Sequence, residues 1–158
     1  MTALPTRKAE AWRYADLAAL AEVWPQGLTS ESLTVAAGDS QSRVILAAAE
    51  PIFRHDLSVT LSAGARLDLR VLLTGRRYAR VAIDVTLHQG AHFEMGGAIL
   101  GTGGETQEIV TTVRHAEPAA TSNQVVRAVL AGKATGSYLG KVIVDRGAEN
   151  VMANGVLS

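Results

Sequence analysis

The chain has 158 residues, of which 47% are hydrophobic and 19% charged, so it can form one globular domain and is not intrinsically disordered. Fifteen basic residues balance fifteen acidic ones, which leaves no overall field to attract nucleic acid or an anionic membrane. The lack of cysteine excludes disulfides and thiolate metal sites, and no run approaches the roughly 20 apolar residues of a membrane span. We therefore expect a cytoplasmic protein that contacts neither nucleic acid nor membrane.

Residues 1–33 are predicted to form an N-terminal helical segment. The stretch 7–23 is rich in Ala, Leu and charged residues, a composition that favours helix, and Pro25 with Gly27 ends it. Asp16 can cap a second short turn, so the sequence leaves open whether this segment is one helix or two. Four residues recur at helical spacing and form a stripe that can cover another element: Trp12, Ala15, Ala19 and Val23.

From about residue 34 the hydrophobic period changes to two, which predicts a β core over 34–158. Alternation is clearest in Leu57–Leu61, Leu67–Val71 and Val81–Leu87. It is weaker at Ile109–Val113 and resumes at Val142–Val144. Because successive side chains of a strand point to opposite faces, each run presents one apolar face to a core.

Small-residue corners separate these runs, and one of them recurs as Gly-Ala at residues 64–65, 90–91 and 147–148. The first interval is 90 − 64 = 26 residues, and the second, 147 − 90 = 57, leaves room for two similar units. Such a unit is typical of a β-solenoid with stacked coils, and also of a jelly roll or sandwich. The residues alone leave both folds open, with the small corners and the aromatic content of 4% slightly favouring stacked coils.

Three sequence blocks carry a resemblance to a known family. The first is PTRKAEAWRYADL (5–17), with matching positions at Glu10, Trp12, Arg13, Tyr14 and Leu17. The second begins at His115 and continues with Thr121, Ser122, Gln124 and Arg127. The third and strongest is VLAGKATGSYLGKVIVDRGA (129–148), with small residues at Gly132, Gly136, Gly140 and Gly147. In this order they resemble the SufB/SufD family of iron–sulfur cluster assembly scaffolds, and SufD more closely than SufB.

The resemblance implies a mainly β fold, a right-handed parallel β-helix with a short N-terminal helical segment. It also implies a non-catalytic scaffold subunit of the SUF machinery that works with SufB-like and SufC-like subunits. The iron–sulfur cluster would belong to that complex, with no cofactor bound by this chain alone. Full-length relatives continue past the position of Ser158 with further coils and a helical domain that docks SufC. The resemblance therefore implies either a chain truncated at its C-terminus or a naturally short relative, and in both cases we expect SufC docking to be lost.

His88, His92 and Glu94 are weak candidates for a metal site. All three have even residue numbers, so an unbroken strand would place two imidazoles and a carboxylate on one face. Gly90-Ala91 lies between the histidines and predicts a turn, so we interpret them as exposed corner residues. The alternative function is a metal-dependent, cupin-like jelly-roll enzyme or binding domain, although the His-x-His core of that class is missing.

Other residues are weaker signals of chemistry. His115 is a weak candidate for cofactor binding, since imidazole can ligate iron, but a histidine that bonds loop backbone is the simpler interpretation. His55 is predicted to be a salt-bridged surface residue. The basic cluster 76–80 could contact phosphate, and a solvated turn explains it more simply. GTGG (101–104) lacks the Lys-Ser/Thr of a phosphate loop, so we interpret it as a flexible corner. We find no catalytic constellation.

A stack of coils leaves unpaired backbone groups at both ends. The N-terminal helix, with Trp12, Tyr14 and Trp24, is predicted to cap one end. Residues 156–158 reach the other end in mid-strand without a cap. We therefore expect that end to bind a partner subunit or a second copy of the chain.

Overall fold

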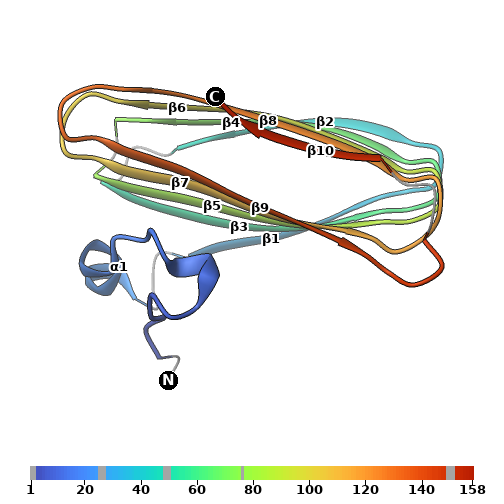
Figure 1. The fold of residues 1–158 in the computed structure, drawn as a ribbon, viewed down its shortest axis with the longest axis horizontal. Helices are drawn as coiled ribbons and strands as arrows, with labels where there is room; N and C mark the ends of the chain where they lie inside the picture. The colour runs from blue at the N-terminus through green and yellow to red at the C-terminus, as the bar shows by residue number, and fades with distance from the viewer. Residues whose placement is uncertain (1–2, 25–27, 48–50, 76, 149–151) are drawn as a thin grey trace.

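The computed structural model describes residues 3–24, 28–47, 51–75, 77–148 and 152–158. These residues form a 3-10 turn, a short helix and ten strands (Figure 1). The helical elements are η1 (Glu10–Trp12) and α1 (Leu17–Val23). The strands are β1 (Leu28–Val35), β2 (Ser40–Leu46), β3 (Ile52–Leu61), β4 (Arg66–Thr74), β5 (Tyr78–Leu87), β6 (His92–Gly101), β7 (Thr106–His115), β8 (Thr121–Leu130), β9 (Thr135–Val144) and β10 (Met152–Leu157).

The strands form two parallel sheets that the chain visits in turn. Sheet A has the order β1-β3-β5-β7-β9, and sheet B has the order β10-β8-β6-β4-β2. Each turn of the chain contributes one strand to each sheet, and about four turns stack into a β-solenoid (Figure 1). The predicted solenoid is thus confirmed. The jelly-roll alternative is wrong, because every strand pair in the described part of the chain is parallel.

The core lies between the sheets and is built from columns of side chains in register. In sheet A, Leu61 lies beside Leu87, and in sheet B, Leu69 lies beside Met95. All four side chains are buried, as are the inward residues of the runs with predicted alternation in β3, β4 and β5. The period of two therefore marks the inward face correctly in the middle coils.

A repeated corner turns the chain from sheet A to sheet B. Glycines 38, 64, 90 and 147 stand there with φ between 67° and 84°, a backbone conformation that suits glycine. Ala119 takes the equivalent position between β7 and β8 with φ of 64°. The 57-residue interval therefore does contain two units, and the corner that divides them lacks glycine.

The N-terminal segment contains two short elements, a 3-10 turn and an α-helix, so the structure decides between the one helix and the two that the sequence left open. Asp16 begins α1, and its Oδ1 accepts a hydrogen bond from the Ala19 amide at 3.0 Å. The β core begins at Leu28, ahead of the boundary predicted at residue 34. That boundary lies too late because β1 has the sequence LTSESLTV, in which Ser, Glu and Thr hide the apolar alternation.

The helical segment packs on the outer face of sheet A and does not cap a coil end (Figure 1). Trp12 and Trp24 lie against Arg54 of β3, with guanidinium-to-ring distances of 5.0 and 4.9 Å. Arg43 of β2 forms an ion pair with Glu31 of β1 and so joins the two sheets at the first coil. The predicted cap is therefore wrong, because the rings stack on cations of the sheet and not on the open coil.

Candidate functional site

His88 does not share a strand with the other two metal candidates. β5 ends at Leu87, Gly90 turns the chain with φ of 67°, and β6 begins at His92. The predicted turn is confirmed. His88 lies in this corner with its Nδ1 3.2 Å from Oε1 of Glu117 on the next coil.

His92 and Glu94 lie in β6 and not in the corner, on the outer face of sheet B. His92 Nε2 is 3.4 Å from Glu94 Oε2, and its Nδ1 is 2.6 Å from Thr121 Oγ1. Asn123 donates to Glu94 Oε1 at 2.8 Å. These side chains form a hydrogen-bonded ladder across neighbouring coils. Across the described ranges, no three His, Asp or Glu side chains are placed to hold a metal ion together.

His115 ends β7 and points into the solenoid, in the column that contains Leu61 and Leu87. Its side chain is fully buried, and Nε2 is 3.1 Å from Oγ of Ser122 in β8. Burial lowers the pKa of His115, and the backbone of Ala120 opposes that change only in part. The imidazole is therefore neutral and enclosed, and it bonds a side chain of the opposite sheet.

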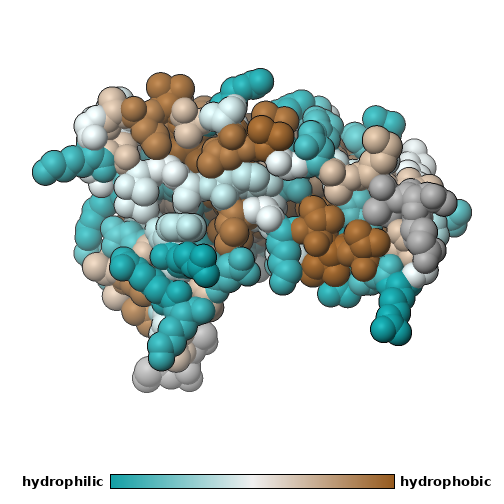
Figure 2. All heavy atoms as spheres, in the orientation of Figure 1, coloured by the Kyte–Doolittle hydropathy of each residue, from teal (hydrophilic) through white to brown (hydrophobic). Residues whose placement is uncertain are grey.

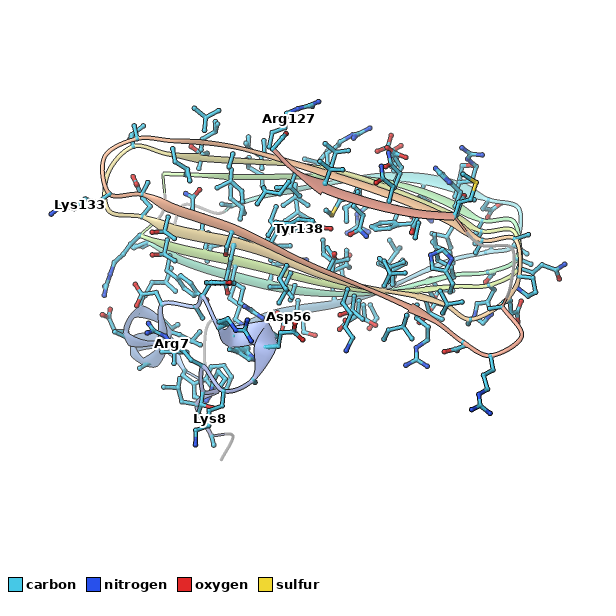
Figure 3. All side chains as sticks on the ribbon, in the orientation of Figure 1. Arg7, Lys8, Asp56, Arg127, Lys133 and Tyr138 are labelled. Atoms are coloured by element: carbon cyan, nitrogen blue, oxygen red, sulfur yellow. The ribbon has the colours of Figure 1, made fainter. Side chains whose placement is uncertain are left out.

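A second polar contact crosses the interior beside this pair. Tyr138 of β9 points into the space between the sheets (Figure 3). Its hydroxyl donates to Gln124 Oε1 of β8 at 3.0 Å and lies 3.2 Å from Oγ1 of Thr111. Gly140 leaves room for the ring, because a Cβ there would lie 2.5 Å from the Tyr138 oxygen. Burial raises the pKa of Tyr138, so its hydroxyl remains a donor.

The shared role of these interior residues is not predicted from the sequence. Ser122 and Gln124 stand out there as matches to a family block, and Tyr138 carries no prediction of its own. The sequence does contain a sign of this role, which is the presence of polar residues at inward positions. Thr111, Ser122 and Gln124 occupy positions that Ile, Phe and Met fill in the preceding coil. Buried polar side chains need hydrogen-bond partners, and these residues form hydrogen bonds with other polar side chains of the interior.

The buried pair of His115 and Ser122 is not arranged for nucleophilic catalysis. In the described part of the chain no carboxylate bonds His115, and both side chains are enclosed. A catalytic pair of this type needs an orienting acid and access for substrate. The contacts instead bind sheet A to sheet B toward the C-terminal end of the stack.

The two described arginines of the basic cluster are paired rather than free. Arg80 is buried in β5 and forms an ion pair with Glu108 of β7, which also accepts a hydrogen bond from Tyr78 at 3.0 Å. Arg77 makes two hydrogen bonds to Glu22 at 2.9 and 2.6 Å. Arg76 lies outside the described residues. A solvated turn is therefore the wrong interpretation for Arg80, which faces the N-terminal segment and has the Trp12 ring centre only 3.7 Å away.

Two further predictions concern His55 and the GTGG corner. His55 is buried in β3, where Nε2 lies 3.5 Å from Glu31 and the ring stacks on Phe53. Its ion pairing is as expected, but the surface position is wrong, because the residue faces inward. In the corner, Gly103 donates its amide to Glu105 at 2.7 Å, and this backbone hydrogen bond lowers the pKa of Glu105. The Glu105 carboxylate thus accepts the Gly103 amide hydrogen bond that a phosphate loop would offer to a bound anion.

Comparisons with known proteins identify the fold's family. The profile described as SUF system FeS cluster assembly, SufBD core domain, matches residues 39–155, which span β2 to β10. Neither the search of curated proteins nor that of solved structures gave a match. None of the helices in the described ranges has the length and apolarity to cross a bilayer. The chain therefore belongs to the SufBD family and has a role in iron–sulfur cluster assembly by the SUF system.

Proposed function

We propose that this chain is a SufD-like scaffold subunit that acts in the cytoplasm within a SufB/SufC/SufD-type complex. The observation that carries the proposal is the family match over the stacked coils, residues 39–155. The subunit positions its partners and turns over no substrate of its own. Its rigid parallel sheets offer long edges, which is the form of surface that strand pairing uses.

The composition of the chain supports a structural part in this process. Iron–sulfur clusters are held mainly by Cys thiolates, and these 158 residues contain none. The imidazole of His115 is enclosed and engaged with Ser122, so it is not presented to a cluster at the surface. We infer that thiolates from a SufB-like partner hold the cluster, which is the cargo of the complex.

The last strands support association with a partner. Val142 and Val144 in β9 and Val156 and Leu157 in β10 have exposed apolar side chains. Figure 2 shows hydrophobic surface over the end of β9 and at the C-terminal end of β10. We propose a SufB-like subunit as the partner, with a second copy of this chain as the competing occupant. The family resemblance assigns SufC docking to a helical domain that follows the coils in full-length relatives.

The test is co-expression of this chain with SufB-like and SufC-like subunits, followed by tandem purification and measurement of iron and sulfide. We expect a complex that carries a cluster, and a chain that binds no stoichiometric metal when purified alone. His92→Gln with Glu94→Gln should leave both results unchanged. Stoichiometric metal that disappears in this variant would instead indicate a metal site at these two residues and contradict the proposal. Open-ended polymers of the isolated chain in light scattering would instead favour self-association.

A further inference from the structure

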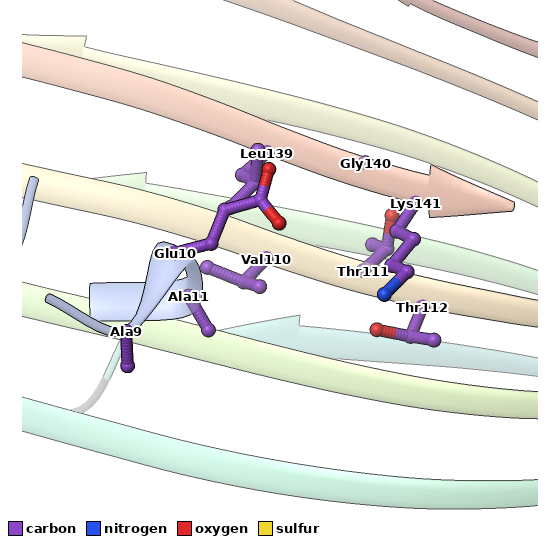
Figure 4. Close-up of a pocket in the computed structure, with 9 residues that line it drawn as sticks. All are labelled: Ala9, Glu10, Ala11, Val110, Thr111, Thr112, Leu139, Gly140 and Lys141. Carbon is purple, nitrogen blue, oxygen red and sulfur yellow. The ribbon is translucent and has the colours of Figure 1, made fainter. Parts of the chain in front are cut away.

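A hollow of about 420 Å³ lies between the N-terminal segment and the outer face of sheet A. Residues 9–11 form one wall, and β7 and β9 form the other (Figure 4). The volume falls in the range of small-molecule sites, roughly 300–1,000 Å³. The hollow is on the opposite face of sheet A from His115, so the interior contacts described above do not explain it.

Two opposite charges flank this hollow. Glu10 extends from η1 over Leu139, while the amine of Lys141 lies beside Thr112 (Figure 4). Within the described residues, neither the Glu10 carboxylate nor the Lys141 amine has a hydrogen-bond or ion-pair partner. An anion and a cation are thus presented to the same space without neutralising each other.

The remaining lining is small and largely apolar. Ala11, Val110 and Leu139 supply aliphatic surface between the two charges, and Thr112 adds a hydroxyl on the lysine side. Val110, Thr112 and Leu139 are half-buried in strands that pair in register, so this side of the hollow is rigid. A short aliphatic group fits such a surface better than a charged or aromatic one.

The wall that carries Glu10 is also held in place. Trp12 ends η1, two residues after Glu10, and its ring lies 3.7 Å from the Arg80 guanidinium and 5.0 Å from that of Arg54. Arg80 is fixed in turn by Glu108. The backbone at Glu10 is thus held in place, so only its exposed side chain has to be ordered when a ligand binds.

We propose that this hollow binds a free α-amino acid with a small aliphatic side chain. The ammonium group would lie against Glu10, the carboxylate against Lys141 and Thr112, and the side chain against Val110 and Leu139. A zwitterion satisfies both unpaired charges, whereas a dicarboxylate or a diamine would bring like charges together at one end. The proposal concerns a second property of the chain and does not depend on its scaffold role.

The test is an NMR titration of the ¹⁵N-labelled chain with L-leucine, L-leucinamide and N-acetyl-L-leucine. The amide removes the ligand's negative charge, and the acetyl group removes its positive charge. We expect L-leucine to shift the amides of residues 9–11 and 139–141 with a Kd of about 0.1 to 10 mM, as suits a ligand with so few atoms. The two derivatives should bind about tenfold to a hundredfold more weakly.

Two variants assign each charge to its partner. In Glu10→Gln, L-leucine should lose its advantage over N-acetyl-L-leucine, and in Lys141→Met it should lose its advantage over L-leucinamide. Asp39→Asn and Lys133→Met change exposed charges that do not line the hollow and should bind L-leucine as the wild type does. Circular dichroism melts establish that each variant is folded. Equal binding of all three ligands, unchanged selectivity in both variants, or no shift at about 20 mM L-leucine, twice the weakest Kd expected, would each overturn the proposal.

Discussion

Ala119 is the one described non-glycine residue with positive φ, and it occupies a corner position that glycine fills in the other coils. An L-residue with a Cβ in this conformation costs roughly 1–2 kcal/mol relative to its usual one. Pro118 precedes it, in a corner one residue longer than the corner between β5 and β6. Strain at a single residue is therefore expected to lower the stability of the corner between β7 and β8.

Ala119→Gly should stabilise the protein. Relief of the positive φ outweighs the greater entropy that glycine adds to the unfolded chain, for a net gain of about 0.5–1 kcal/mol. Thermal denaturation should show a Tm higher by roughly 1–4 °C. Ala116→Gly is the matched control, since Ala116 lies in the same corner without positive φ. A Tm that falls equally in both variants would contradict the assignment of strain.

His115 predicts a dependence of stability on pH. Its folded pKa lies below the ordinary value of 6.5, so the unfolded chain binds the proton more readily. The stability contribution is present above about pH 6.5 and is lost as the pH falls towards the folded pKa. Urea denaturation across about pH 7.5 to 5.5, a window that brackets the ordinary histidine pKa, should therefore give a falling free energy of unfolding. His115→Gln should flatten this slope, while His88→Gln in the exposed corner should retain it.

At the scale of elements, the contact between the N-terminal segment and sheet A combines cation–π interactions with a small apolar cluster that includes Leu20 of α1 and Tyr78 of β5. Arg54 lies against both Trp12 and Trp24, whose rings meet edge to face at 6.3 Å. Burial lowers the pKa of Arg54, with Asp56 opposing this change at an N–O distance of 2.9 Å. Besides Tyr78 and Ile52, the segment thus covers charged side chains, which water could solvate if the segment detached. We infer that sheet A can persist without it.

Trp12→Ala should release the segment and leave the solenoid folded. Each cation–π contact contributes about 0.5–2 kcal/mol, and this variant removes those with Arg54 and Arg80. Hydrogen exchange of the Ala19 and Leu20 amides should become at least about tenfold faster, with little change in β5 and β6. Tyr14→Ala is the control, because that side chain is 55% exposed. If the strands lose protection together with α1, the segment is an integral part of the core.

At the scale of the whole molecule, stability is carried by the stacking of neighbouring coils. Every inner strand pairs on both sides, whereas β1, β2, β9 and β10 are edge strands among the described residues. Stacked-coil proteins behave as a row of units coupled to their nearest neighbours. The middle coils also contain the largest buried side chains, including Phe93 and Met95.

Native-state hydrogen exchange should therefore be slowest in the middle of the stack. We expect the greatest protection in β4, β5 and β6 and the least in β1 and β10, because opening of a terminal coil breaks one interface instead of two. Uniform protection across all ten strands would show a single cooperative unit. Slower exchange confined to β9 and β10 on addition of a SufB-like partner would place the partner on that edge.

The chain by itself determined the β core, the inward face of the middle strands and the corner glycines. These are properties of residues that are adjacent in the chain, and the period of two reports them directly. The lack of cysteine likewise defined what chemistry these residues can supply. Three ordered blocks were sufficient to indicate the family that residues 39–155 match.

Only the tertiary structure decided where the polar residues lie. Arg80 and Glu108 are 28 residues apart, and Tyr138 and Gln124 are on opposite sheets, so no local pattern brings either pair together. The same holds for the N-terminal segment, which lies on the face of sheet A because Arg54 and Arg80 of different coils meet Trp12 there. Each of these contacts joins residues that are distant in the sequence. They meet only because successive coils stack in a particular register, and a local sequence pattern does not specify that register.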